Sequence, residues 1–294
     1  MRVLNLGSLN LDRTYEVPHF VGPGETVLST GYRTSCGGKG LNQSVALARA
    51  GAEVFHAGAV GEDGGALWDL LASAGVDLSR LRRLAGPSGH AVIQLTPAGE
   101  NCILVSGGAN AAVTGELVDA ALAGFGAGDV LLLQNEVSCV DYAIRRGRAQ
   151  GMAVALNPSP INDALLRCPL EQVDLFLLNE VEGRALAGGE GDRDILERLA
   201  RRFPGAAIVL TVGERGAWYQ RDGETLHQPI FPVAVADTTA AGDTFCGFFL
   251  AALGRGCAPA RALEMASRAS ALAVSRPGAA DSIPTWDEAA AFGG

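Results

Sequence analysis

The chain has 294 residues, of which 48% are hydrophobic and 19% are charged, and its formal net charge is −9 at pH 7. This composition is typical of a globular protein with ample apolar material for one large core or two domains, and it excludes a disordered chain. The negative charge and the lack of a basic cluster argue against nucleic-acid binding, which needs a surface rich in lysine and arginine.

The cysteines and the N-terminal stretch bear on the cellular compartment. The six cysteines contain no CxxC pair, so their spacing suggests neither a zinc site nor a disulfide framework, and reduced thiols are expected. The N-terminal run MRVLNLGSLNLD carries polar residues within its apolar stretch, and no later run reaches membrane-spanning length. We therefore expect a cytoplasmic protein without a membrane partner.

Strand-like and helix-like segments alternate along the chain. Continuous apolar runs that end in polar residues predict strands buried on both faces, at 3–12, 130–136, 153–159, 175–180 and 207–214. Helical segments are predicted at 40–51, 66–75, 114–124, 142–151, 192–203 and 241–254. This alternation predicts one Rossmann-like α/β domain over residues 1–294, with a mostly parallel central sheet flanked by helices.

Two regions break the alternation. Residues 13–36 contain PGET and have no helical period, and residues 89–106 have the pattern of two strands around a turn. Together they predict a small β-sheet that projects from the α/β body as a candidate lid, although an ordinary surface hairpin is the alternative. Exposed strand edges in such a lid would favour pairing with a second subunit.

Polar residues follow several predicted strands. In parallel sheets, ligands bind beyond the carboxyl ends of the strands. The residues at those ends are Asn10, Asp12, Glu136, Asn157, Asn179, Thr211 and Gly213. Amides and carboxylates suit a neutral polyhydroxylated ligand, whose hydroxyl groups both donate and accept hydrogen bonds. A phosphorylated substrate would be repelled by Asp12 and Glu136.

The stretch CGGKGLNQ, residues 36–43, forms a glycine-rich turn before a predicted helix. It is not a P-loop, because Gly40 follows Lys39 where that motif requires serine or threonine. The first strand is not followed by a GxGxxG fingerprint either, which disfavours NAD. The remaining features are glycines that allow close approach to the backbone, a lysine within the turn, and Asn42 at the helix start.

The stretch DTTAAGDTFCGFFL, residues 237–250, places two carboxylates around the start of an apolar helix. Ala240, Ala241 and Gly242 are small enough for a phosphate to reach the backbone amides, where the helix dipole favours an anion. Asp243 could be an ordinary N-cap. Beside a phosphate, however, its carboxylate is better explained as a general base for a hydroxyl that attacks phosphorus.

Several of these motifs occur together in one known family. GSLNLD (7–12), PGET (23–26), GGKGLNQ (37–43), GGANAAV (107–113), ALNPSP (155–160), NEVEGR (179–184), TVGERGAW (211–218) and DTTAAGDTF (237–245) resemble the ribokinase (phosphofructokinase-B-type) family of sugar kinases. The resemblance runs from Gly7 to about Pro284. It implies a ribokinase-like fold and ATP-dependent phosphorylation of a pentose, with D-ribose at O5 as the expected substrate.

The resemblance also assigns roles to residues. It implies that Asp243 is the base and that the amides of residues 240–243 form the anion hole. The implied sugar-binding residues are Asn10, Asp12, Gly38, Lys39, Asn42, Glu136 and Asp243. The implied nucleotide-binding residues are Asn179, Thr211, Gly213, Glu214, Gly216, Gly242 and Ser267.

The family's cofactors and assembly add further expectations. Glu182 would organise Mg²⁺ through water. A monovalent cation, usually K⁺, would be held by residues that match the family's positions, namely Asp237, Thr239, Ala273, Arg276, Gly278 and Ser282. The resemblance further implies a homodimer whose lids interlock.

Other functions stay open at the level of sequence. The substrate could be another neutral sugar such as fructose or deoxyribose, or a nucleoside such as adenosine, for which Tyr15, Phe20 or Tyr32 could stack on the base. A non-catalytic regulator that binds sugar or nucleotide is a further alternative. The retention of Asp243 together with its small-residue turn argues against it.

Overall fold

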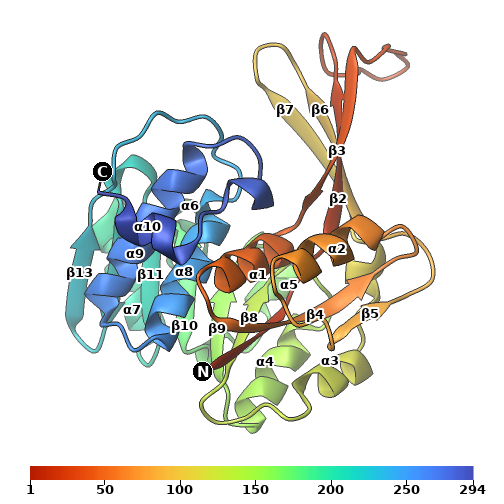
Figure 1. Ribbon diagram of the computed structural model, residues 1–294. Helices are drawn as coiled ribbons and strands as arrows, with labels where there is room; N and C mark the ends of the chain where they lie inside the picture. The colour runs from red at the N-terminus through yellow and green to blue at the C-terminus, as the bar shows by residue number, and fades with distance from the viewer. Residues whose placement is uncertain (294) are drawn as a thin grey trace.

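A computed structural model describes residues 1–293, and its main body is built on a nine-stranded sheet (Figure 1). The strand order is β13-β12-β11-β10-β9-β8-β1-β4-β5, and only β12 and β13 run antiparallel to their neighbours. The strands are β1 (Arg2–Leu6), β4 (Glu53–Val60), β5 (Leu81–Arg83), β8 (Val130–Gln134), β9 (Ala153–Asn157), β10 (Leu175–Asn179), β11 (Ala207–Thr211), β12 (Ala217–Arg221) and β13 (Glu224–Gln228). The predicted α/β architecture with a mostly parallel sheet is confirmed.

Helices cover both faces of this sheet, and each face has its own apolar cluster. One face carries α1 (Lys39–Arg49), α2 (Gly65–Ser73), α8 (Ala241–Gly254), α9 (Pro259–Val274) and α10 (Trp286–Ala291). The other carries α3 (Gly115–Leu122), α4 (Val140–Ala149), α5 (Asp163–Leu166), α6 (Glu180–Ala187) and α7 (Asp192–Arg202). Among residues 1–293, no helix combines the length and apolar character that crossing a bilayer requires.

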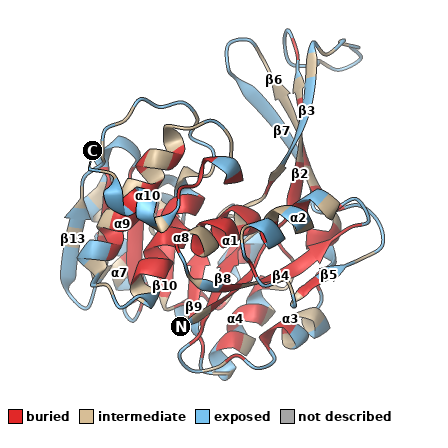
Figure 2. Ribbon diagram, viewed as in Figure 1, coloured by how far each residue is buried: buried red, intermediate tan, exposed pale blue. Residues whose placement is uncertain are grey.

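A second sheet of four strands stands away from the body (Figure 1). Its strands are β2 (Asn10–Glu16), β3 (Gly31–Gly37), β6 (Gly89–Leu95) and β7 (Asn101–Ser106), in the order β3-β2-β6-β7. The central pair β2–β6 is parallel, and both outer pairs are antiparallel. Its outer strands β3 and β7 are largely exposed, its inner strands β2 and β6 are mostly buried or half-buried, and the central strands of the main sheet are buried (Figure 2).

The prediction of one continuous strand over residues 3–12 is wrong. The chain leaves the main sheet after Leu6 and resumes at Asn10 in the projecting sheet. The cause is the N-terminus of α1, which lies directly against the end of β1: a Cβ on Gly7 would lie 2.5 Å from Gly40 Cα. Asn10 and Asp12 therefore belong to the projecting sheet and not to the edge of the main one.

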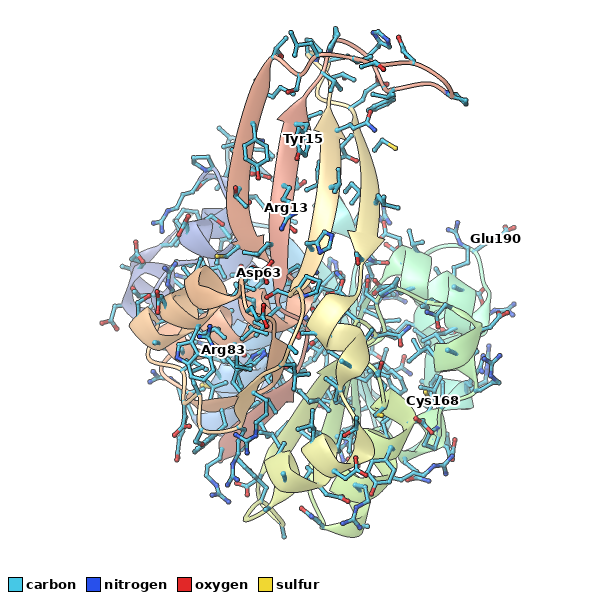
Figure 3. All side chains as sticks on the ribbon, turned by 90° about the vertical axis from the view of Figure 1, so that its right-hand side faces the viewer. Arg13, Tyr15, Asp63, Arg83, Cys168 and Glu190 are labelled. Carbon is cyan, nitrogen blue, oxygen red and sulfur yellow. The ribbon has the colours of Figure 1, made fainter. Side chains whose placement is uncertain are left out.

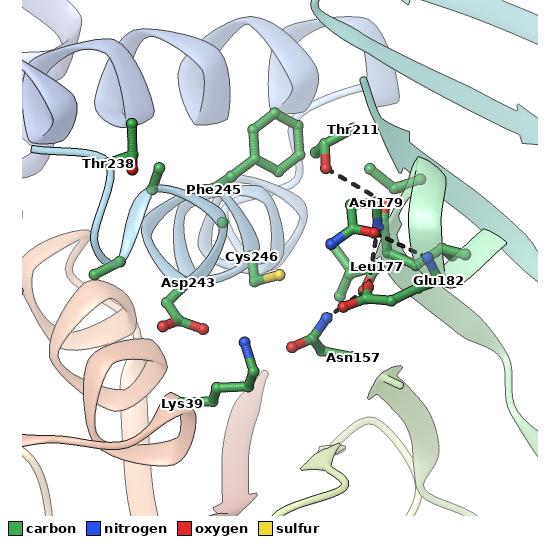
Figure 4. A pocket seen from close by; sticks show the side chains of 15 residues that line it. Lys39, Asn157, Leu177, Asn179, Glu182, Thr211, Thr238, Asp243, Phe245 and Cys246 are labelled. Carbon is green, nitrogen blue, oxygen red and sulfur yellow. Dashed lines mark hydrogen bonds between the residues drawn. The ribbon is translucent and has the colours of Figure 1, made fainter. Parts of the chain in front are cut away.

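Helices α1 and α8 pack in very close contact. A Cβ on Gly247 would lie 2.4 Å from Ala46 Cβ and 2.9 Å from the Leu47 amide nitrogen, so any side chain at position 247 would push the helices apart. This contact brings the first turns of α1 and α8 together. Both begin at the carboxyl edge of the main sheet, where β9, β10 and β11 end (Figure 4).

Candidate active site

A cavity of about 230 Å³ lies at this carboxyl edge (Figure 4). Its wall combines the N-terminus of α8 with the ends of β9, β10 and β11 and the start of α1. The expected site residues that line it are Lys39, Asn179, Glu182, Thr211, Ala240, Ala241, Gly242 and Asp243. The structure thus brings together residues that are separated by up to about two hundred positions in the chain.

The start of α8 forms an uncapped turn. Ala240 adopts a left-handed conformation, with φ 60° and ψ 8°, and no side chain caps the helix. The first N–H groups of a helix have no partner within it, so this end offers amide donors to a ligand. Nothing lies within 4 Å of the position that a Cβ on Gly242 would occupy. There is therefore open space above the turn.

Asp243 lies in the first turn of α8 and is only 7% exposed. Both of its carboxylate oxygens accept hydrogen bonds from side chains of α1: Asn42 Nδ2 donates to Oδ2 at 2.9 Å, and Gln43 Nε2 donates to Oδ1 at 2.9 Å. Because both donors come from a second helix, the carboxylate does not act as a cap for its own helix. Its orientation depends on the α1–α8 contact.

Lys39 is the first residue of α1, and its side chain points into the cavity between Asp243 and Asn157 (Figure 4). Burial lowers the pKa of its ammonium, but the negative charges of Asp243, Glu136 and Glu182 outweigh this and raise the pKa above its usual value. Lys39 is therefore charged. It is the only cationic residue that lines the cavity within the described part of the chain.

The main chain of Lys39 faces a different group. Its N–H donates to Glu136 Oε2 at 3.1 Å, and the Ser8 hydroxyl donates to the same oxygen. Gly38 precedes it with φ +98°, and a Cβ there would lie 2.9 Å from the Ser8 carbonyl oxygen, so only glycine fits this turn. These contacts fix Glu136 beside the start of α1.

Asn10 and Asp12 extend this polar region into the projecting sheet. Asn10 Oδ1 accepts a hydrogen bond from Asn110 Nδ2 at 2.8 Å. The carboxylate of Asp12 has no hydrogen-bond partner among residues 1–293. Burial together with the charge of Glu136 raises the pKa of this carboxyl group to about 6. Unpaired polar groups of this kind are available to hydroxyl groups of a ligand.

The residues assigned to the nucleotide lie in two groups. Asn179 and Glu182 form a capping box on α6, in which Glu182 N–H donates to Asn179 Oδ1 at 2.9 Å and Asn179 N–H donates to Glu182 Oε2 at 3.0 Å. They line the cavity together with Thr211. Outside the cavity wall lie Gly213, Glu214 and Gly216, in the turn after β11, and Ser267 on α9.

Of the residues assigned to a monovalent cation, Asp237, Thr239 and Gly278 are in contact next to the start of α8. Thr239 donates to Asp237 Oδ1 through its N–H at 2.9 Å and through its hydroxyl at 2.6 Å, and the Gly278 N–H donates to Oδ2 at 3.1 Å. These contacts join the segment before α8 to the segment after α9. Ala273 lies in the last turn of α9. Arg276 pairs with Glu288 at 2.8 Å, and the Ser282 hydroxyl donates to the Ala279 carbonyl at 2.8 Å.

Sequence reasoning missed several residues of the site. Gln43 contacts Asp243 directly, and Asn157, Thr238, Phe245 and Cys246 line the cavity. Asn157 was visible as a polar strand end without a role, and Gln43 belongs to the quoted glycine-rich stretch. Phe245 and Cys246 gave no signal, because the inner face of an apolar helix looks the same with or without a cavity.

An uncapped helix start, a buried carboxylate and a charged lysine around one cavity of an α/β sheet are the groups that phosphoryl transfer requires. The family described as "pfkB family carbohydrate kinase" matches residues 2–286. The chain belongs to this family and is a sugar kinase of the ribokinase family.

Relatives and solved structures agree with this assignment. The chain is 35% identical over 299 residues to the ribokinase of Haemophilus influenzae, covering 98% of this chain and 96% of that one. It is 33% identical over 259 residues to the deoxyribokinase of Salmonella typhi, covering 85% and 84%. Among solved structures, the ribokinase of Thermotoga maritima matches with a TM-score of 0.86 and 31% identity, covering 99% and 98%. The ribokinase of Arabidopsis thaliana, complexed with ribose and ATP, matches with a TM-score of 0.85 and 29% identity, covering 99% and 97%.

Proposed function

We propose that this enzyme transfers the γ-phosphoryl group of ATP to O5 of D-ribose, giving D-ribose 5-phosphate and ADP. The observation that carries the proposal is the position of Asp243, which lies in the first turn of α8 and lines a cavity together with the uncapped amides of that turn. The similarity to ribokinases, one of them solved with ribose and ATP, supports ribose as the acceptor.

In the proposed mechanism, Asp243 accepts the proton of the sugar hydroxyl as its oxygen bonds to the γ-phosphorus, and the bond from phosphorus to the bridging oxygen of ADP breaks. General-base assistance of this kind contributes about 10²–10⁴ in rate. The amides of Ala240, Ala241, Gly242 and Asp243 would stabilise the charge on the transferred group, because no side chain caps this end of α8; the Ala241 N–H would exchange its 3.3 Å contact with the Thr238 carbonyl for the phosphate. The Lys39 ammonium would add a positive charge at the same end of the cavity.

The sugar would bind on the projecting-sheet side of Asp243. Asn10, Asp12, Gly38, Asn42, Glu136 and the main chain of Lys39 supply donors and acceptors for a ring with several hydroxyl groups. Glu136 is oriented by Ser8 and the Lys39 N–H, and Asn10 by Asn110. Two carboxylates here favour a neutral sugar over one that already carries a phosphate.

The nucleotide would bind on the opposite side of Asp243. Asn179, Thr211 and Gly242 lie in the cavity wall, and Gly213, Glu214, Gly216 and Ser267 continue from it toward α9. Gly216 is required for packing, since a Cβ there would lie 2.1 Å from the Gln228 carbonyl oxygen. Nothing lies within 4 Å of a Cβ position on Gly213, so a base could approach the backbone of this turn there.

Magnesium and a monovalent cation fit the chemistry of the residues assigned to them. Within residues 1–293, no three His, Cys, Asp or Glu side chains form a metal site, so Mg²⁺ would depend on phosphate oxygens and water, with Glu182 as an outer ligand. For K⁺, Asp237 and the carbonyl groups near Ala273, Arg276 and Gly278 supply hard oxygen ligands, with Thr239 and Ser282 beside them. When bound, both ions would neutralise negative charge that accumulates near the phosphates.

The projecting sheet is suited to close over the sugar and to pair with a second copy of the chain in a homodimer. Its outer strand β7 is exposed along its whole length, and Ile103, Leu104 and Val105 are 52%, 71% and 63% exposed. An exposed apolar strand at a sheet edge favours pairing with another chain. Light scattering of the purified protein would test the dimer. A Leu104→Lys variant should shift it toward the monomer.

Deoxyribose is the second candidate acceptor, because the chain is 33% identical to a deoxyribokinase over 85% of its length. A nucleoside such as adenosine is less favoured. Tyr15 and Tyr32 pack against each other with their rings tilted and the centroids 4.9 Å apart. Alternation along β2 puts Tyr15 on the face opposite to Asp12. Fructose and a non-catalytic role have no observation of their own in favour.

A sugar panel tests the proposal. ADP release should be measured with ribose, deoxyribose, fructose and adenosine, each with Mg·ATP and with or without K⁺. The proposal predicts that ribose gives the highest kcat/KM and that K⁺ raises it. A higher kcat/KM for another acceptor would contradict ribose specificity, and sugar binding without ADP release would contradict the kinase mechanism.

A further inference from the structure

A continuous chain of buried polar side chains leads from Asp243 to the far side of β1. Gln43 Nε2 donates to Asp243 Oδ1 at 2.9 Å and to Asn157 Oδ1 at 3.2 Å, and Gln43 Oε1 accepts from Gln134 Nε2 at 2.6 Å. Gln134 Nε2 also donates to Asn5 Oδ1 at 2.9 Å. The amides of Gln43, Gln134 and Asn5 lie on α1, β8 and β1, and all three are 0% exposed.

The chain continues to a buried histidine. Asn5 Nδ2 donates to Ser44 Oγ at 2.8 Å, and Ser44 Oγ lies 2.8 Å from His56 Nδ1. Burial lowers the pKa of His56 to about 4, although a contact with the Gly7 backbone opposes the change, so the ring is neutral near pH 7. A neutral ring can accept a hydrogen bond from the Ser44 hydroxyl at Nδ1.

The polarity of every link depends on its neighbour. An ionised carboxylate only accepts hydrogen bonds, so Gln43 must present its NH₂ group to Asp243 and its carbonyl oxygen to Gln134. If the Gln43 amide turned over, its oxygen would face the Asp243 carboxylate and its NH₂ group would face the NH₂ group of Gln134. Both contacts would be unfavourable, because Gln43 and Gln134 are fully buried.

We propose that Gln43 is a positioning residue for the base, and that Gln134 acts through it by holding the Gln43 amide in the orientation that donates to Asp243. This inference rests on the proposed role of Asp243 and goes beyond it. Neither glutamine is among the described residues that line the cavity, so neither is placed to contact a substrate bound there. Their expected effect on catalysis is therefore indirect: they set the orientation of the Asp243 carboxylate and hence the direction of its free lone pairs.

The arrangement makes a distinctive prediction for a double-mutant cycle. Gln43→Leu removes a hydrogen bond to a charged group and should lower kcat about 10- to 100-fold. Gln134→Leu removes the donor to the Gln43 carbonyl oxygen, while Asn157 Oδ1 still accepts from the Gln43 NH₂ group, and should lower kcat about 3- to 10-fold. In the double variant kcat should stay within about twofold of that of Gln43→Leu, because Gln134 has nothing left to orient. The KM values for sugar and ATP should stay within about threefold of wild type in all three.

The control and the folding checks separate this role from a purely structural one. Gln220→Leu on β12 is the control and should leave kcat unchanged. Gln220 has a buried oxygen without a hydrogen-bond partner among the described residues, and it pairs with Ile208, at the other end of β11 from Thr211 in the cavity wall. Melting curves and ADP binding would establish that each variant is folded. If Gln43→Leu does not fold, Gln43→Asn replaces it, since this amide is one methylene too short to reach both partners.

The outcomes are distinguishable. A wild-type kcat in folded Gln134→Leu would overturn the inference, as would a double variant whose loss equals the product of the single losses, or losses confined to KM. Turnover should be measured with whichever acceptor gives the highest kcat/KM for the wild type. The inference is thereby tested even if ribose is not that acceptor, and a wild-type enzyme that releases no ADP with any sugar would contradict the proposed function instead.

Discussion

Replacing Asp12 by asparagine should make the protein more stable at neutral pH while weakening its binding of sugar. The carboxyl group of Asp12 has its pKa raised from 3.8 to about 6, first by burial and second by the charge of Glu136. A rise of this size corresponds to about 3 kcal/mol. Because the side chain is partly exposed, solvent screening reduces the expected gain for Asp12→Asn to about 1–2 kcal/mol.

The sign of the pH dependence follows from proton binding. Between about pH 4 and pH 6 the folded state binds more protons at Asp12 than the unfolded state does, so wild-type stability falls as the pH rises through this window. The asparagine variant lacks this loss. The two proteins should therefore melt together at pH 4, and the variant should melt about 2–3 °C higher at pH 7.5.

Thermal melts at both pH values and calorimetric titration with ribose measure the two effects. Wild-type affinity for ribose should weaken below about pH 6 as Asp12 is protonated, whereas the affinity of the variant should be lower and independent of pH. Asp63 is the matched control, because it pairs with Arg13 at 3.6 Å near the base of the projecting sheet (Figure 3). Burial raises the pKa of Asp63, but hydrogen bonds from Ser88 and the charge of Arg13 lower it overall, so Asp63→Asn should destabilise the protein at pH 7.5. An Asp12→Asn variant less stable than wild type at pH 7.5 would refute the reasoning.

Three further substitutions test the helix contacts that build the site. Gly247→Ala should cost about 1–3 kcal/mol in a urea titration and lower kcat, since its Cβ would lie 2.4 Å from Ala46 Cβ and would separate α1 from α8. Gly65→Ala is the control: nothing lies within 4 Å of the added Cβ, so this variant should be neutral or slightly stabilising. Equal losses of unfolding free energy in Gly247→Ala and Gly65→Ala would contradict the packing argument. Ala240→Val should lower stability by at least about 1 kcal/mol, because a β-branched residue is strained at φ 60°. Ala240→Gly should relieve strain at the same position. A valine variant as stable as the wild type would show that this turn is not left-handed. Lys39→Met should raise the KM for ATP and lower kcat without changing the melting temperature by more than a few degrees, and unchanged kinetics would place the ammonium away from the phosphates.

The sequence predicted the parallel strands well, because strands buried on both faces have a continuous apolar pattern. The strands β8 to β11 were all found within a few residues of their ends. By contrast, β4 was not predicted, since EVFHAGAV mixes a buried histidine with small residues and lacks a long apolar run. The break at Gly7 was also missed, because it depends on the position of Gly40 in α1 and not on local sequence.

The candidate site was predictable where the chemistry lies in a contiguous motif. The residues 240–243 and Lys39 were chosen from local stretches, and the structure places them in one cavity. Gln134 could not be found in this way. It is a polar residue in an apolar strand, and its contacts with Gln43 and Asn5 join positions 91 and 129 residues away. Such contacts appear only when the sheet and α1 are in place.

Turnover of an Asp243→Asn variant is the most direct test of the central claim, that this carboxylate in the first turn of α8 takes the proton of the acceptor hydroxyl. Asparagine keeps the size of the side chain but cannot accept that proton. The account predicts that ADP release with ribose falls by at least about 10², while ribose binding measured by calorimetry changes only a few-fold. Turnover close to that of the wild type, with ribose still bound, would contradict it.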